Sequence, residues 1–181
     1  MRFVNPKSRE RYVAAHAALR ILIEAYFGLA SYRQAFSTTP LGKPQLAGYP
    51  DIQCSLSYSG DHALLGVAPG AEIGLDIEQI RTITDAEDLA SVYFTEREKS
   101  FLQANSPDSP AFHRDFLRIW TRKEACLKAV GQGLNGFNTI ECAPGEMTTP
   151  VRIGQSQVHA GAIAMRNYAA SWARATPLIS F

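Results

Sequence analysis

The sequence predicts an α+β fold, and two observations support that prediction. Residues 5–28 and 109–131 combine helix start and stop signals with apolar side chains at a period of about 3.6. Each of these long stretches is followed by about three short strand-like runs, so the two halves of the chain have the same order of elements. A chain of 181 residues can bury a core, either as one domain or as two small lobes.

The composition gives no support for binding to nucleic acid or membranes. The 18 basic and 17 acidic side chains leave a formal net charge of +1, too small to attract phosphate backbones or anionic lipids. No signal peptide is visible, and no apolar run approaches the ~18 residues that a membrane span needs. The three cysteines lack metal-binding spacing, and their odd number is typical of reduced thiols. We therefore expect a soluble, cytoplasmic protein.

The first half begins with the helix expected over residues 5–28, where an Asn-Pro pair provides the start. Its apolar stripe consists of Tyr12, Ala15, Leu19, Leu22, Ile23 and Tyr26. A loop rich in proline and glycine follows over residues 40–50 and contains Lys43. Strands are then expected over residues 52–57, 62–68 and 72–77.

The second half contains two short helices, the second long helix and three more strands. The short helices are expected over residues 85–93 and 96–103, and Thr95 and Glu98 match the capping-box pattern. Glu98 is therefore either a structural cap or a catalytic carboxylate. The three strands are expected over residues 138–142, 157–165 and 168–173.

The second long helix presents Lys123, Glu124 and Lys128 as candidate functional residues. Lys123 projects from the middle of the apolar stripe, where a lysine either extends along its stem to solvent or meets an anion. Glu124 and Lys128 lie one turn apart at the edge of that stripe. Taken alone, this pair is typical of an exposed ion pair that contributes roughly 0.2–0.5 kcal/mol.

The strand over residues 73–78 presents two carboxylates. Asp76 and Glu78 are two residues apart, so in a strand they share one face. Two carboxylates on one face repel each other unless a positive charge lies between them. A divalent cation with oxygen ligands would provide that charge, and Glu124 could complete a triad of ligands. The alternative is a strand that ends in solvent, and a D-x-E pattern by itself is a weak signal.

Together, the strand and the helix resemble a known family. GLDIE at residues 74–78 and WTRKEACLK at residues 120–128 resemble the paired signature of the 4′-phosphopantetheinyl transferases. Three further matches occur in the family order: GKP at residues 42–44, FT-x-x-E at residues 94–98 and G-x-GL at residues 131–134. The spacing is similar to that of the larger, surfactin-synthetase-activating type.

The resemblance implies how the two halves are arranged. Each half would form a lobe in which a long helix packs on a small antiparallel sheet, and a pseudo-twofold axis would relate the lobes, with the substrate between them. We place the N-terminal lobe at residues 1–82 and the C-terminal lobe at residues 83–181. The resemblance begins at Arg2, so the N-terminal lobe would lack the first strand usual for this type. The protein would be a monomer with pseudo-dimeric lobes.

The resemblance also implies an activity: Mg²⁺-dependent transfer of 4′-phosphopantetheine from coenzyme A to a serine of an apo acyl or peptidyl carrier protein, with release of 3′,5′-ADP. Asp76, Glu78 and Glu124 would bind Mg²⁺. Glu124 would also be the general base, while Lys128 would contact the transferred phosphate. Because residues 81–101 lie between the strand and the helix of the paired motifs, at the junction of the two halves, we expect their apolar side chains to form the docking surface for the carrier protein, with Arg97 or Arg81 at its rim. Contacts to coenzyme A would come from Arg11, Lys43, Ser57, Tyr58, Ser59, Lys123 and Lys128.

Tyr58 departs from the family pattern, which has histidine between the two serines. A phenol donates one hydrogen bond but does not become cationic as imidazole does, so the contact to the cofactor 3′-phosphate would be weakened. One alternative is therefore a catalytically impaired homologue that binds carrier proteins without modifying them. Another is a metal-dependent phosphodiesterase, but the sequence contains no histidine cluster to support a metal-bound water as nucleophile.

Overall fold

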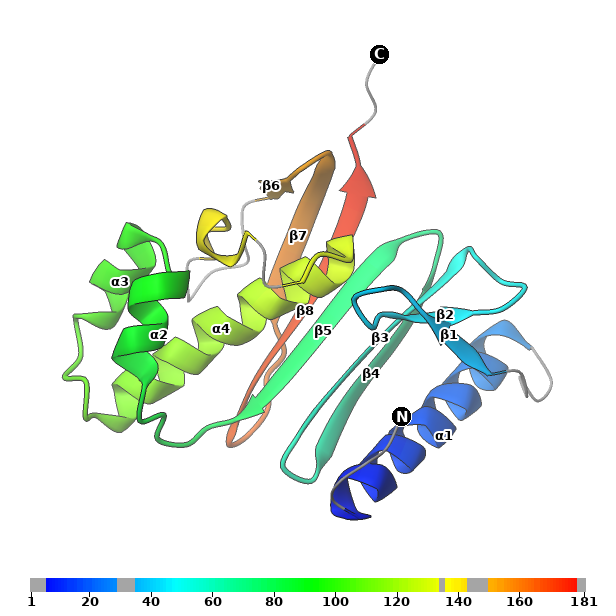
Figure 1. Ribbon diagram of the computed structural model, residues 1–181, viewed down its shortest axis with the longest axis horizontal. Coiled ribbons are helices and arrows are strands. Elements are labelled where there is room, and N and C mark those ends of the chain that lie inside the picture. Colours follow the sequence, from blue (N-terminus) through cyan, green and yellow to red (C-terminus); the bar gives the residue numbers. More distant parts are fainter. Residues whose placement is uncertain (1–5, 29–34, 134–135, 143–149, 179–181) are drawn as a thin grey trace.

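The computed structural model describes residues 6–28, 35–133, 136–142 and 150–178 (Figure 1). The predicted cap at Asn5 and the end of the G-x-GL motif therefore lie outside the described residues. None of the described helices is both long and apolar enough to cross a membrane. In chain order the elements are α1 (Pro6–Phe27), β1 (Phe36–Thr38), β2 (Pro44–Leu46), β3 (Ile52–Ser59), β4 (His62–Pro69), β5 (Glu72–Gln79), α2 (Ala86–Tyr93), α3 (Glu96–Leu102), α4 (Pro110–Val130), η1 (Phe137–Thr139), β6 (Val151–Ile153), β7 (Ser156–Ala162) and β8 (Tyr168–Pro177).

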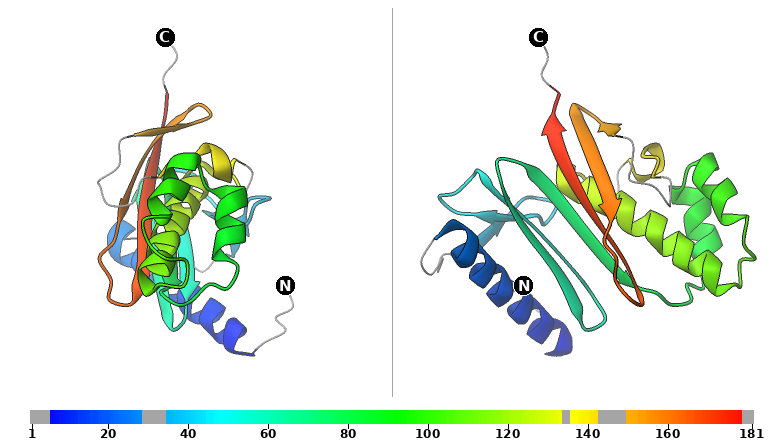
Figure 2. Two further views of the ribbon diagram at one scale, coloured as in Figure 1. Left: turned by 90° about the vertical axis from the view of Figure 1, so that its left-hand side faces the viewer. Right: turned by 180° about the vertical axis from the view of Figure 1, so that it is seen from behind.

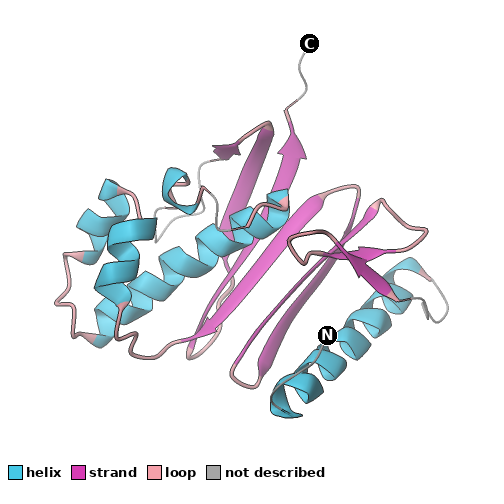
Figure 3. Cartoon of the chain, in the orientation of Figure 1, coloured by secondary structure: helices cyan, strands magenta, loops and turns pink. Residues whose placement is uncertain are grey.

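Two four-stranded antiparallel sheets organise the structure (Figure 3). The first sheet has the strand order β1-β2-β3-β4, and the second has the order β5-β8-β7-β6. The helix α1 packs against β4, whereas α4 packs against β5, β8 and β7. Figure 2 shows α2, α3 and α4 on one face of the second sheet, because β7 and β8 lie in front of α4 when the molecule is seen from behind. The predicted α+β class is confirmed.

The strand β5 belongs to the sheet of the C-terminal elements, although the predicted lobe boundary lies after it. It pairs with β8 along its whole length, from Glu72↔Ala175 to Gln79↔Tyr168. The two sheets therefore divide between the end of β4 and the start of β5. Such long-range pairing leaves no local signal in the sequence, which explains why the boundary at residue 82 differs from the sheet assignment. The division into two lobes at that residue stays a prediction.

The helix α4 lies in the main core and has the predicted start and stop signals. Ser109 caps its N-terminus by accepting a hydrogen bond from Phe112 N at 3.1 Å, and Pro110 occupies the first turn. Gly131 ends the helix in the left-handed region, at φ 66°. The core around α4 includes Phe116, Ile119, Cys126 and Leu127 of its apolar stripe.

A glycine allows β5 and α4 to approach closely. A Cβ atom on Gly74 would lie 1.9 Å from the carbonyl oxygen of Ala125 and 2.4 Å from the backbone nitrogen of Ala129. Backbone atoms within a helix cannot move aside as a flexible side chain can. The glycine of the GLDIE motif is therefore required by the packing of the strand against the helix.

The helix α1 forms a smaller core with the first sheet, where Leu19 and Ile23 pack with Cys54 of β3. Burial raises the pKa of the Cys54 thiol to about 11, against a smaller opposing effect of the Lys43 ammonium. The predicted apolar stripe is wrong at its C-terminal end, because Tyr26 is 75% exposed. This residue lies in the last helical turn, which the sheet does not cover on that side.

The structure corrects several short elements. The strands β1, β2 and β6 have three residues each and lie outside the predicted strands, since three residues are too few to display a periodicity. The strand predicted over residues 138–142 is wrong: the 3₁₀ turn η1 occupies Phe137–Thr139, and residues 140–142 are neither helix nor strand. Phe137 and Ile140 are both buried, and a spacing of three residues suits a helical turn rather than an alternating strand.

Candidate active site

The strand β5 presents its two carboxylates on the face that packs against α4. Gly74, Asp76 and Glu78 lie on the same face of the strand, because side chains alternate along it. A Cβ atom on Gly74 would point at the backbone of α4, so this face packs against α4. Asp76 is only 4% exposed, whereas Glu78 is half-buried. A buried carboxylate requires hydrogen-bond donors or a cation, so the groups around Asp76 decide what this face can do.

Serine hydroxyls of β3 contact both carboxylates. Ser57 Oγ donates a hydrogen bond to Asp76 Oδ1 at 2.8 Å. Ser59 Oγ donates a hydrogen bond to Glu78 Oε2 at 2.9 Å. The two contacts link the first sheet to the carboxylates of the second.

The same row of serines also satisfies the free edge of β5. The backbone nitrogen of Leu75 donates to Ser55 Oγ at 2.9 Å, and that of Gln79 donates to Ser59 Oγ at 3.0 Å. An edge strand normally leaves such groups to water or to another strand. Here side-chain hydroxyls take the place of a strand partner and hold β5 against β3.

Lys128 of α4 pairs with Asp76. Its Nζ lies 2.6 Å from Asp76 Oδ1 and 3.3 Å from Ser57 Oγ. The second oxygen, Asp76 Oδ2, is buried and has no hydrogen-bond partner in the described part of the chain. Lys128 therefore reaches across to the strand, rather than forming the simple exposed pair with Glu124 that the helix alone suggests.

Glu124 is half-buried one turn before Lys128. Burial raises the pKa of its carboxyl group above the usual value. The ammonium group of Lys128 lowers this pKa, whereas the charges of Asp76 and Glu78 raise it. The charges of Asp76 and Glu78 thus act on Glu124 across the space between β5 and α4.

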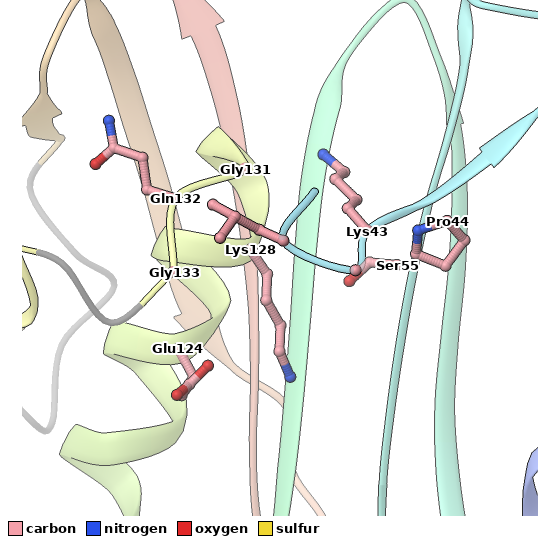
Figure 4. A pocket seen from close by; sticks show the side chains of 10 residues that line it. Lys43, Pro44, Ser55, Glu124, Lys128, Gly131, Gln132 and Gly133 are labelled. Carbon is pink, nitrogen blue, oxygen red and sulfur yellow. The ribbon is translucent and has the colours of Figure 1, made fainter. Parts of the chain in front are cut away.

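A pocket lies next to these side chains, between α4 and the loop that leads into β2. Figure 4 shows Glu124 and Lys128 extending from α4, with Lys43 and Ser55 on the opposite side. Lys43 is held there because its Nζ donates to the carbonyl oxygen of Ala129 at 3.2 Å and forms an ion pair with Glu72. The pocket is lined by Leu41, Gly42, Lys43, Pro44, Ser55, Glu124, Lys128, Gly131, Gln132 and Gly133.

The carboxylates of this site are suitable ligands for a divalent cation, although they are not assembled as a ligand cluster. Carboxylate oxygens are the ligands that Mg²⁺ prefers, and the unpartnered Oδ2 of Asp76 is available as one. Among the described residues, however, no three His, Cys, Asp or Glu side chains are gathered closely enough to hold a metal ion. The predicted convergence of Asp76, Glu78 and Glu124 on one ion stays a prediction.

The structure corrects the expected role of Lys123. Its side chain is 0% exposed, and its Nζ donates to Glu98 Oε2 at 2.5 Å and to the carbonyl oxygen of Ile140 at 2.6 Å. Glu98 also accepts a hydrogen bond from Cys142 N and completes the capping box with Thr95. Lys123 therefore faces the core of the C-terminal elements, where the anion that it meets is a protein carboxylate and not a ligand. The predicted cap at Glu98 is confirmed.

Arg11 and Tyr58 lie outside the pocket. Arg11 forms an exposed ion pair with Asp61 in the turn between β3 and β4, at 3.1 Å. Tyr58 is 42% exposed and, by strand alternation, points away from the face that carries Ser57 and Ser59. The structure thus gathers Lys43, Glu124 and Lys128 around the pocket, but it does not bring these two residues to it.

The sequence prediction did not include Ser55 and Gln132, which also line the pocket. Ser55 could have been found, because serines at 55, 57 and 59 share one strand face at a period of two. Gln132 follows the glycine that ends α4, and no local pattern indicates that its side chain would line a pocket.

Comparison with known proteins places these elements in a family. The model of the 4′-phosphopantetheinyl transferase superfamily matches residues 72–173, which include β5 and α4. The 4′-phosphopantetheinyl transferase HetI of Nostoc sp. is 35% identical over 145 residues, which are 78% of this chain and 60% of that protein. Sfp of Bacillus subtilis is 28% identical over 134 residues, which are 74% of this chain and 58% of Sfp. The chain thus spans less than two thirds of the length of these relatives.

Among solved structures, a holo-(acyl-carrier-protein) synthase from Bacillus anthracis in complex with CoA (3′,5′-ADP) is similar at a TM-score of 0.48 and 21% sequence identity. The similarity covers 57% of this chain and 94% of that chain.

Proposed function

Because this chain belongs to the 4′-phosphopantetheinyl transferase superfamily, we propose that it transfers 4′-phosphopantetheine from coenzyme A to a serine of an apo acyl or peptidyl carrier protein, releasing 3′,5′-ADP. One observation carries the proposal. The carboxylates of Asp76 and Glu78 on β5 interact electrostatically with Glu124, and Lys128 pairs with Asp76 beside a pocket. Carboxylates for a cation and lysines for phosphates are the groups that transfer from a pyrophosphate needs.

Asp76, Glu78 and Glu124 would hold Mg²⁺ in this proposal. The ion, when bound, neutralises charge that develops on the leaving phosphate. Its affinity is supported by the unpartnered Oδ2 of Asp76. The pKa of Glu124 is raised mainly by burial, and repulsion from Asp76 and Glu78 raises it further. A cation would relieve that repulsion.

Glu124 would accept the proton of the attacking serine. A general base must be reachable by the substrate, and Glu124 is a half-buried residue that lines the pocket. A raised pKa makes its carboxylate a stronger proton acceptor than an exposed glutamate. Lys128 would bind the phosphate oxygens, which requires its ammonium group to share or leave Asp76.

Coenzyme A would lie along β3 from the pocket to the β3–β4 turn. Lys43 borders the pocket at one end, and Arg11 and Tyr58 lie toward the turn at the other. Between Ser55 and Ser59 the strand rises about 13 Å, which is a suitable length for an extended cofactor. Lys43 would exchange its contacts with Glu72 for contacts with a phosphate.

The carrier protein would dock over residues 81–101. A second hollow beside Glu78 supports this position, because it contains residues of that segment together with part of α4. Val92 and Phe101 are exposed apolar residues of the same segment, whereas Phe94 is buried and Arg97 pairs with Glu141. The hollow is lined by Glu78, Arg81, Thr82, Ile83, Thr84, Asp85, Leu89, Phe116, Leu117 and Trp120.

The arrangement of two similar lobes around a pseudo-twofold axis is also part of the proposal. Two observations support this arrangement. One long helix packs against each sheet, and the pocket lies between α4 and residues of the first sheet.

Mass spectrometry of an apo carrier protein, incubated with coenzyme A, Mg²⁺ and this protein, tests the proposal directly. We expect the carrier mass to increase by one phosphopantetheine group and 3′,5′-ADP to appear in equal amount. Glu124→Gln should slow both changes by about 100-fold or more. His159→Ala is the control, because His159 is exposed on β7 and its side chain alternates with the buried Val158 and Ala160.

Other results would contradict the transfer. A carrier protein that binds but keeps its mass would indicate the impaired homologue. Loss of coenzyme A without modification of the carrier would instead indicate a hydrolase.

A further inference from the structure

We propose that Ser57 and Ser59 are positioning residues, which orient Asp76 and Glu78 as ligands for a divalent cation. This inference rests on the proposed function of the two carboxylates. It differs from the expected contacts of these serines with coenzyme A, because a hydroxyl group has only one proton to donate.

The two strands match each other in spacing. Ser57 and Ser59 are two residues apart on β3, as Asp76 and Glu78 are on β5, and the serine contacts advance in the same direction along both strands. Because side chains repeat at a period of two in every strand, each serine meets one carboxylate.

At Asp76, the donors leave one oxygen for a ligand. Oδ1 accepts hydrogen bonds from Ser57 Oγ at 2.8 Å and from Lys128 Nζ at 2.6 Å. Oδ2 is buried and has no partner among the described residues. The serine therefore fixes the rotation of a carboxylate whose other oxygen remains able to bind a cation.

Each serine is constrained to donate toward its carboxylate. Gln79 N donates to Ser59 Oγ at 3.0 Å, so the hydroxyl proton must go to another acceptor, and Glu78 Oε2 lies at 2.9 Å. Lys128 Nζ likewise donates a hydrogen bond to Ser57 Oγ at 3.3 Å, so the hydroxyl proton of Ser57 is directed to Asp76. Both hydroxyls are thus held as donors in the protein without any ligand.

The experiment measures Mn²⁺ affinity by calorimetry in the absence of coenzyme A, for wild type, Ser57→Ala and Ser59→Ala. We expect Ser57→Ala to weaken Mn²⁺ binding by about 10-fold or more, as is typical when the partner of a metal ligand is removed. Ser57→Thr keeps the hydroxyl group and suits a strand, so it should retain most of the affinity.

Ser55→Ala is the matched control. Ser55 lies on the same strand face and borders the pocket, but within the described part of the chain its hydroxyl accepts a hydrogen bond from the backbone nitrogen of Leu75 and contacts no carboxylate. This variant should lose stability to urea without a change in Mn²⁺ affinity. If Ser57→Ala does not fold, Ser59→Ala and Ser57→Thr still allow the comparison.

Equal Mn²⁺ affinity in Ser57→Ala, Ser59→Ala and wild type would overturn the inference, as would a wild-type protein that binds no Mn²⁺. An equal loss of Mn²⁺ affinity in Ser55→Ala would also overturn it, since the loss would then come from weakened packing of β3 against β5 and not from the serine–carboxylate hydrogen bonds. Because Mn²⁺ binding needs no carrier protein, a serine-dependent affinity without transfer activity would contradict only the proposed function.

Discussion

Lys123 and Glu124 are adjacent in the sequence, but their side chains have different surroundings. Lys123 is fully buried against Glu98 and the carbonyl oxygen of Ile140, whereas Glu124 borders the pocket. One residue along a helix rotates a side chain by about 100°, which suffices to separate a core residue from a site residue. The functional assignment of such a motif must therefore be made residue by residue.

The buried pair of Lys123 and Glu98 leads to a stability prediction. Lys123→Met should reduce the free energy of unfolding by about 3 kcal/mol or more, because Glu98 would remain buried without its cation. Urea unfolding measures this loss. The double variant Lys123→Met with Glu98→Gln should recover part of it.

Arg97→Ala is the control for the buried pair, since the ion pair of Arg97 and Glu141 is exposed and should contribute about 1 kcal/mol or less. A small effect of Lys123→Met on unfolding, together with a large loss of coenzyme A affinity, would contradict the structural role.

The raised pKa of Glu124 predicts a pH-dependent stability. In the folded state its pKa lies above the usual glutamate value of 4.5, so this group favours folding below that pH, and the contribution is lost as the pH rises through the folded pKa. In EDTA at pH 7, Glu124→Gln should therefore be more stable than wild type. The difference should disappear below about pH 4.5, the unfolded value. Urea unfolding at several pH values measures both effects.

Glu124→Gln should also lower the transfer rate by about 100-fold or more, the usual effect of losing a general base. A variant that is less stable than wild type at pH 7 would show that the carboxylate is favourably paired rather than repelled.

At the scale of elements, the contact of β5 with α4 depends on one glycine. Gly74→Ala should destabilise the protein by about 3 kcal/mol or more, because the new methyl group would lie 1.9 Å from the carbonyl oxygen of Ala125. The collision is with backbone, so the strand must move and carry Asp76 with it. Thermal unfolding and Mn²⁺ titration should both detect the change.

Gly133→Ala is the control for Gly74→Ala, since a Cβ there would meet Leu41 at an ordinary distance of 3.5 Å. A Gly74→Ala protein as stable as Gly133→Ala would disprove the close packing of β5 and α4.

At the scale of the whole molecule, the proposed cofactor path crosses from the pocket to the β3–β4 turn. Tyr58 is uncharged, so coenzyme A and dephospho-coenzyme A should differ in dissociation constant by less than about tenfold, or ~1.4 kcal/mol. Tyr58→His adds a group that can become cationic below its pKa. It should strengthen binding of coenzyme A at pH 6 and leave dephospho-coenzyme A unchanged. Calorimetry with both ligands tests this.

A wild-type preference well above tenfold for coenzyme A would mean that another residue binds the 3′-phosphate. Arg11→Ala would then be informative, because the pair of Arg11 with Asp61 is exposed and close to the same turn.

The sequence by itself determined the elements that have local signals. The helix α4 follows its periodicity and its caps, as Ser109 and Gly131 demonstrate at its two ends. The capping box of Thr95 and Glu98 was readable from two residues three apart. The strand β5 and the paired motifs also identified the family, because the chemistry requires particular residue types at close spacing.

Only the tertiary structure decided which distant residues meet. The pairing of β5 with β8 joins segments about one hundred residues apart, and no local pattern encodes it. The contacts of Ser57 with Asp76 and of Lys123 with Glu98 likewise depend on how two elements pack. A periodicity states which face of an element is apolar, but a polar residue takes its role from the partner that packing places opposite it.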